Sequence, residues 1–98
     1  MQTILATGGA GYIGSHTCIE LLKKGYRVII FDSLINSSEK VFEKIKYISS
    51  KGNFDYSSNC SFIFGDIRDK KLLDEIFYKE IQNKNKIDAV LHCSGLKS

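Results

Sequence analysis

Three evenly spaced glycines constrain this sequence more than any other feature. Residues 7–14 read TGGAGYIG, which places Gly8, Gly11 and Gly14 at every third position. The segment follows a short apolar run and leads into residues 12–24, whose apolar residues recur at helical spacing. A glycine-rich turn from strand to helix, within a βαβ unit of about thirty residues, is typical of a dinucleotide-binding fold. A tight turn that binds no ligand has no use for three spaced glycines.

Each glycine has its own physical role in such a loop. Gly8 can adopt a positive φ and turn the chain sharply. Gly11 has no side chain to keep a pyrophosphate from the backbone, and Gly14 lets the helix pack close to the strand. The helix N-terminus then presents unpaired N–H groups to the phosphates. Because no GK[ST] sequence follows the loop, a triphosphate site with a lysine and magnesium is not indicated.

Two aspartates follow later apolar runs. Asp32 can accept hydrogen bonds from both hydroxyls of an adenosine ribose, and it would repel a 2′-phosphate. Since no arginine lies beside it in the sequence, the cofactor is predicted to be NAD and not NADP. The alternative for Asp32 is a helix cap or a solvated strand end. Asp66 can bond the adenine amino group while Ile67 covers the ring face, or both residues can form a plain turn.

Alternation of β-rich and amphipathic segments predicts the fold class. The expected strands are residues 3–6, 27–31, 61–64 and 87–92. The expected helices are residues 12–24, a segment capped by Ser37 or Ser38, and a segment capped by Asp69. This order indicates an α/β fold, a Rossmann-type doubly wound parallel sheet. We expect four strands in the order 3-2-1-4, with helices on both faces.

The second and third helices each carry one apolar face. The residues of these faces are Val41, Phe42, Ile45 and Ile48 in the second helix, and Leu72, Leu73, Ile76, Phe77 and Ile81 in the third. Between them, residues 51–60 are polar and contain Gly52 and Asn53, so a surface loop is predicted there.

Composition excludes several classes of protein. With 43% hydrophobic and 26% charged residues, disorder is excluded as the main description. No apolar run approaches the roughly 18–20 residues that span a bilayer, and the start lacks the features of a signal peptide, so a cytoplasmic protein is expected. The net charge of +3 comes from dispersed lysines, which does not indicate a nucleic-acid surface.

The cysteines and histidines do not indicate a metal site or a disulfide framework. Cys18, Cys60 and Cys93 are odd in number and lack CxxC spacing, and neither histidine has the spacing of a metal ligand. Each cysteine is expected to be a small, buried or half-buried side chain.

Four segments carry a resemblance to a known family. They are TGGAGYIGSHT at 7–17, FDSLINSS at 31–38, GDIR at 65–68 and HCSGLK at 92–97. In this order they resemble the UDP-glucose 4-epimerase family, which belongs to the extended short-chain dehydrogenases/reductases. The resemblance covers all 98 residues. It implies an NAD-dependent isomerase of galactose metabolism. Such an enzyme interconverts UDP-galactose and UDP-glucose by hydride transfer at sugar C4, through a 4-keto intermediate.

The resemblance also implies a set of NAD contacts. Backbone amides of Tyr12 and Ile13 would contact the pyrophosphate. Residues 93–95 would run beneath the cofactor, and Lys97 would reach its ribose or phosphate oxygens. The family usually has Phe-Ala where this chain has Cys93-Ser94. The full implied set is Gly8, Gly11, Tyr12, Ile13, Gly14, Asp32, Ser33, Asn36, Ser37, Asp66, Ile67, Cys93, Ser94, Gly95 and Lys97.

No catalytic residue is expected within these 98 residues. The family uses a tyrosine, with a lysine four positions later, from a strand and helix beyond residue 98. Tyr47 and Lys51 match this spacing, but they lie in the second crossover, on the adenosine side, and such a pair is expected by chance. Tyr47 is predicted to be partly buried. Residues 1–98 are therefore expected to be the N-terminal part of an NAD-binding Rossmann domain, inactive without the remainder and the substrate domain.

Two alternatives stay open at this stage. One is another NAD-dependent nucleotide-sugar dehydratase or oxidoreductase of the same superfamily, and the other is a stand-alone, non-enzymatic module that binds a dinucleotide. For the epimerase, the expected partners are a UDP-sugar substrate and a second copy of the whole protein in a homodimer. Residues 87–92 would form an exposed edge strand, so the 98-residue chain by itself is expected to be poorly stable or to self-associate through this edge.

Overall fold

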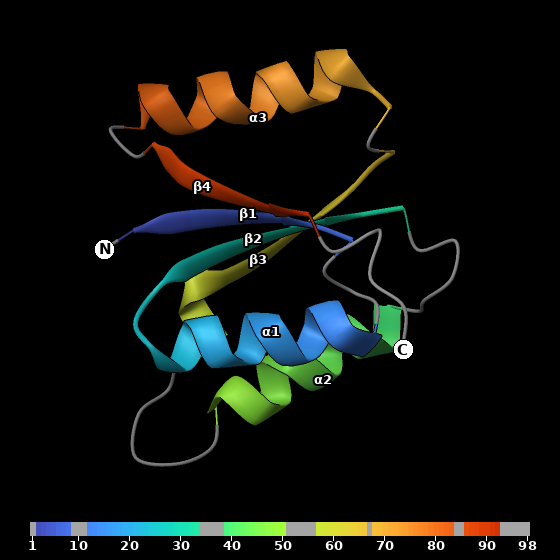
Figure 1. Cartoon of the computed structure of the whole chain (residues 1–98), viewed down its shortest axis with the longest axis vertical. Helices are drawn as coiled ribbons and strands as arrows, with labels where there is room; N and C mark the ends of the chain where they lie inside the picture. Colours follow the sequence, from blue (N-terminus) through green and yellow to red (C-terminus); the bar gives the residue numbers. More distant parts are fainter. Residues whose placement is uncertain are drawn as a thin grey trace.

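Four parallel strands form one sheet in this computed structural model, which describes residues 2–8, 12–33, 39–50, 57–66, 68–83 and 86–92 (Figure 1). The strands are β1 (Thr3–Thr7), β2 (Arg27–Asp32), β3 (Cys60–Phe64) and β4 (Ile87–His92). The helices are α1 (Tyr12–Lys23), α2 (Glu39–Ser50) and α3 (Lys70–Gln82), with a 3-10 turn, η1 (Ser57–Asn59), before β3. The strand order is β3-β2-β1-β4, which confirms the predicted topology and α/β class.

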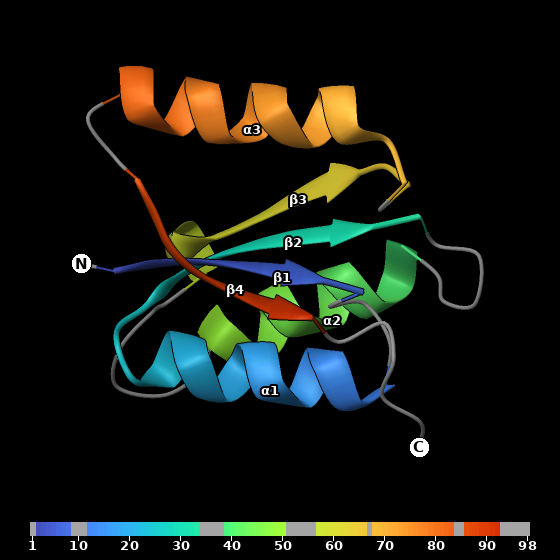
Figure 2. The ribbon, with the colours of Figure 1, turned by 45° about the horizontal axis from the view of Figure 1, so that its top comes forward.

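Helices cover the sheet from both sides. Helices α1 and α2 lie against one face and α3 lies against the other, as Figures 1 and 2 show from two directions. All pairs of neighbouring strands are parallel, so their carboxyl ends meet at the same edge of the sheet. Among the residues described, none of the helices has the length and hydropathy that crossing a bilayer requires.

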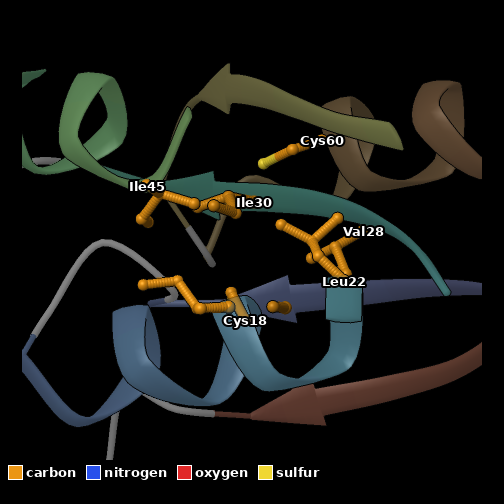
Figure 3. Packing of buried hydrophobic residues seen from close by; sticks show 8 residues of the cluster. Cys18, Leu22, Val28, Ile30, Ile45 and Cys60 are labelled. Atoms are coloured by element: carbon orange, nitrogen blue, oxygen red, sulfur yellow. The ribbon is translucent and has the colours of Figure 1, made fainter. Parts of the chain in front are cut away.

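The larger core lies between the sheet and helices α1 and α2 (Figure 3). Its buried residues come from β1, both helices, β2 and β3; they are Ala6, Cys18, Ile19, Leu22, Val28, Ile30, Ile45 and Cys60. The expectation that Cys18 and Cys60 are buried is confirmed, whereas Cys93 lies outside the described residues. The loop prediction was wrong at Cys60, because this residue pairs with Val28 and begins β3. Residues 57–59 of the predicted loop form η1, and 51–56 lie outside the described residues.

The second core lies beneath α3. Leu5, Ile29, Phe31 and Ile76 are buried there, and Leu72, Leu73, Ile63 and Ile87 pack around them. The predicted cap of α3 is confirmed, since the Asp69 carboxylate accepts a hydrogen bond from the Leu72 N–H at 3.1 Å. The apolar face continues to Phe77 and Ile81, which stay 36% and 64% exposed.

An ion pair holds the other end of α3 to the sheet. Arg27, at the start of β2, donates from Nη1 to Glu80 Oε2 at 2.8 Å and from Nη2 to Glu80 Oε1 at 3.1 Å. The two side chains are 30% and 12% exposed, so this paired contact is largely shielded from solvent. The ion pair therefore links the C-terminal half of α3 to the start of β2.

A β-bulge at Asp88 was not predicted. Thr3 pairs with Ile87, but Ile4 pairs with Ala89, so Asp88 is the extra residue of β4. The Thr3 N–H donates to Asp88 Oδ2 at 2.8 Å, which satisfies the backbone group at the irregularity. Because of the extra residue, Ile87 and Val90 lie opposite Thr3 and Leu5 and share the face that α3 covers.

We predict that Gly65→Ala lowers the free energy of unfolding by about 1–3 kcal/mol through overpacking. An added Cβ would lie 2.6 Å from Leu72 Cδ2, 2.7 Å from Phe31 Cε2 and 2.8 Å from Phe31 Cζ. Phe31 is 1% exposed, so its ring has no open space to enter. Urea unfolding of the single variants and of Gly65→Ala/Leu72→Ala measures the effect. Gly65→Ala should cost less in the Leu72→Ala background, because one of the two clashes is gone. An unchanged or increased stability of the single variant would contradict the packing.

We predict that Cys60 resists alkylation in the folded protein. Burial raises the pKa of this thiol to about 11, and the Lys46 charge offsets only part of that increase. Since the thiolate is the nucleophile, iodoacetamide at pH 8 should leave Cys60 unmodified until urea is added. Peptide mass spectrometry distinguishes Cys60 from the other two cysteines. Labelling at the rate of an unfolded peptide, without urea, would show that the thiol is accessible.

Candidate functional site

The carboxyl ends of the strands gather the candidate residues at one edge of the sheet (Figure 2). Thr7 lies beside Phe31 on one side and beside His92 on the other, and Asp32 lies beside Phe64. The N-terminus of α1, which begins at Tyr12, lies at the same edge. In open α/β sheets, ligands bind outside this edge, at the point where the strand order reverses. Here the order reverses between β1 and β4.

The start of the glycine loop has the conformation that the sequence predicted. Gly8 has a φ of 72° and donates its N–H to the Phe31 carbonyl at 2.7 Å, which ties the end of β1 to β2. Gly14 is buried within α1. The first turn of α1 contains no acidic residue, so nothing in it opposes an anion at the helix N-terminus. Tyr12 and Ile13 begin this helix, and the structure describes their backbone only.

Asp32 and Ser33 mark the exit of β2, and both are half-buried. The Gly65 N–H donates to the Asp32 carbonyl at 3.0 Å, so the residues that follow β3 are tied to the end of β2. Asp66 therefore leaves the sheet next to Asp32. The two aspartates that the sequence singled out are brought to neighbouring strand ends.

Asp66 also forms the turn that was its alternative role. Its Oδ1 accepts the Arg68 backbone N–H at 2.8 Å, and its carbonyl accepts the Asp69 N–H at 2.9 Å. The Arg68 side chain donates to both carboxylate oxygens, from Nε at 3.1 and 3.2 Å and from Nη2 at 2.7 Å. The Arg68 side-chain hydrogen bonds, and then its backbone N–H, lower the pKa of Asp66 to about 2. Sequence reasoning missed Arg68, although the spacing Asp-x-Arg after a strand is a signal for such a turn.

A second polar contact joins β1 to β4. Thr7 Oγ1 lies 2.7 Å from His92 Nδ1, a hydrogen bond between residues 85 positions apart. Thr7 is 2% exposed, whereas His92 is exposed. Sequence reasoning gave neither residue a role, and no local pattern pairs them.

The remaining predicted contacts lie outside the described residues; they are Gly11, Asn36, Ser37, Ile67, Cys93, Ser94, Gly95 and Lys97. Tyr47 is 59% exposed on α2, so the prediction that it is partly buried was wrong. Its aromatic ring lies outside both cores. Within the described ranges, no group of three or more metal-ligating side chains occurs.

Comparisons with known proteins agree with this geometry. A family described as GDP-mannose 4,6 dehydratase matches residues 5–98. The UDP-glucose 4-epimerase of Haemophilus influenzae is 46% identical over 97 residues, which are 99% of this chain and 25% of that protein. The solved UDP-glucose-4-epimerase of Stenotrophomonas maltophila, with bound NAD and formylated UDP-arabinopyranose, is 41% identical with a TM-score of 0.80. It is matched over 100% of this chain and 26% of its own.

A second solved structure shows a similar fold over about the same share of its chain. The UDP-glucose 4-epimerase of Bifidobacterium longum, in complex with NAD+ and UDP, is 40% identical with a TM-score of 0.74. The match covers 99% of this chain and 25% of that one, so the chain spans about a quarter of the length of these relatives. Because the family model matches residues 5–98, the chain belongs to the GDP-mannose 4,6 dehydratase family, and it is similar to UDP-glucose 4-epimerases over about a quarter of their length.

Proposed function

We propose that this chain is the NAD-binding segment of a UDP-glucose 4-epimerase. The observation that carries the proposal is the turn at Gly8, which has a φ of 72° and donates its N–H to the carbonyl of Phe31, the residue before Asp32. Similarity to epimerases that are 41% and 40% identical and hold NAD supports the same cofactor here.

The described residues fit a dinucleotide. Backbone N–H groups of the first turn of α1 would bind the pyrophosphate, and the absence of acidic residues there favours the anion. The half-buried Asp32 would accept hydrogen bonds from the adenosine ribose. Asp66 is ionised and already bound by Arg68, so an adenine amino group would have to share this carboxylate. The resemblance alone assigns contacts to Asn36, Ser37, Cys93, Ser94, Gly95 and Lys97, whereas the glycine spacing also points to Gly11 and the residue type to Ile67.

When bound, NAD supplies the hydride acceptor and donor for sugar C4. The residues of this chain would hold and orient it at the strand ends, and we assign none of them a role in proton transfer. A tyrosine and a lysine four positions later would serve that role in the whole enzyme, with a UDP-sugar as substrate. A homodimer and a cytoplasmic location remain predictions.

A dehydratase is the second candidate, because the matching family is described by that activity. The natural gene product should be given UDP-galactose without added NAD. An epimerase forms UDP-glucose, whereas a 4,6-dehydratase forms a 4-keto-6-deoxy sugar nucleotide. GDP-mannose is offered in a parallel reaction, because the matching family is described by that substrate. If no product forms from either sugar nucleotide and NAD still binds, the assignment to these two enzymes fails and a dinucleotide-binding module is favoured.

We predict that the natural gene product binds NAD at least ten-fold more tightly than NADP, and that Asp32→Asn removes this preference. The substitution takes away the charge that repels a 2′-phosphate and weakens the ribose contact, so NAD affinity should fall about ten-fold. Isothermal titration calorimetry measures both affinities. Asp74→Asn, an exposed change on α3, is the matched control and should alter neither. Equal affinities for NAD and NADP in the unaltered protein would contradict the role of Asp32.

We predict that the Asp66 carboxyl titrates near pH 2 in the folded protein. Arg68 stabilises the ionised form, so the folded pKa lies below the unfolded one. The pair therefore contributes stability above about pH 4, and that contribution is lost as the pH falls towards 2. Carbon NMR of the carboxyl group follows the titration. In Arg68→Gln the midpoint should rise towards the ordinary aspartate value, and a midpoint that does not move would mean that another group lowers the pKa.

A further inference from the structure

The hydrogen bond between Thr7 and His92 spans the point where the strand order reverses. Thr7 ends β1 and His92 ends β4, and the register places them side by side. Strands β2 and β3, with Asp32 and Asp66, lie on the other side of β1. The Thr7–His92 contact therefore lies on the opposite side of β1 from the strands that lead to both aspartates.

The geometry of this contact is that of a fixed pair. The Thr7 hydroxyl is buried, and its oxygen lies 2.7 Å from His92 Nδ1. A ring protonated at Nε2 accepts the hydroxyl hydrogen, and a ring protonated at Nδ1 donates to the hydroxyl oxygen. In both tautomers the bond orients the imidazole, whose outer part is exposed at the strand ends.

The two residues directly precede the segments to which the resemblance assigns the cofactor. Gly8 follows Thr7 and begins the glycine loop, and residues 93–97 follow His92. A shift of β4 along β1 would move these segments relative to each other. The bulge at Asp88 interrupts this strand pair near its start, and beyond it the backbone pairing runs without interruption to Thr7 and His92. The side-chain bond adds a restraint on the two strand ends at the edge where the cofactor segments begin.

We infer that Thr7 and His92 are a positioning pair for the nicotinamide riboside half of the bound dinucleotide. The inference rests on the proposed function. If adenosine lies over β2 and β3 and the pyrophosphate lies at α1, the other half of NAD lies over β1 and β4. The Thr7–His92 bond holds these two strand ends in place beneath it.

The test compares NAD with ADP as ligands of the natural gene product. ADP contains the adenosine and pyrophosphate and lacks the nicotinamide riboside. In Thr7→Val and in His92→Phe, the NAD dissociation constant should rise about 5- to 30-fold, while that of ADP should stay within two-fold. Calorimetric titration gives both constants. Unchanged ADP binding also shows that each variant is folded.

Two conservative variants and one double variant complete the design. Thr7→Ser keeps the hydroxyl, and His92→Asn places an amide near the position of Nδ1, so both should retain most of the NAD affinity. In Thr7→Val/His92→Phe, the NAD affinity should be no weaker than in the poorer single variant, because both changes remove the same bond.

Each other outcome overturns the inference. Equal losses for NAD and ADP would mean that the pair supports the fold in general, and unchanged NAD binding would mean that it has no positioning role. Additive losses in the double variant would mean that the residues act separately. If the unaltered protein binds ADP but not NAD, or binds neither ligand, the proposed function itself is wrong. The positioning role of Thr7 and His92, which rests on that function, is then wrong as well.

Discussion

Burial of the two central strands on both faces is the constraint on which the rest of the structure depends. All five residues of β1 are buried, and so are the four inner residues of β2. Such strands need continuous apolar runs, which the sequence supplies as Ile4–Leu5–Ala6 and Val28–Ile29–Ile30–Phe31. Because helices cover both faces, neither strand can slide without exposing apolar surface to water. Gly8 and Asp32 therefore leave the sheet at defined points.

Polar contacts then position the helix and the turn that pack on this apolar core. Asp69 caps the start of α3, and Arg27 of β2 binds Glu80 near the end of the helix, which restrains that end on the sheet. The turn that leads into α3 contains Asp66, whose carbonyl accepts the Asp69 N–H. The position of a candidate adenine contact is thus linked to the packing of a helix that belongs to the second core.

Most of the fold follows from local patterns. Continuous apolar runs identified the strands, three-to-four spacing identified the helices, and the glycines located the turn into α1. The errors have physical reasons. Cys60 was placed in a loop because its neighbours are polar, but its pairing with Val28 and its burial against α1 and α2 make it part of β3. The bulge at Asp88 could not be read from residues 87–92, because it exists only relative to β1.

The candidate site also combines features that the sequence predicts with contacts that only the tertiary structure reveals. By itself, the sequence determined the chemistry at the strand ends: glycines that permit a positive φ, an acid-free helix start and aspartates after strands. Each of these depends on residue type and on a few neighbours along the chain. Only the tertiary structure decided which groups meet, as in the bond between Thr7 and His92, and how far Arg68 engages Asp66. Contacts between residues distant in sequence arise from strand register and helix packing, because these are set by the burial of apolar surface over the whole sheet and leave no local pattern.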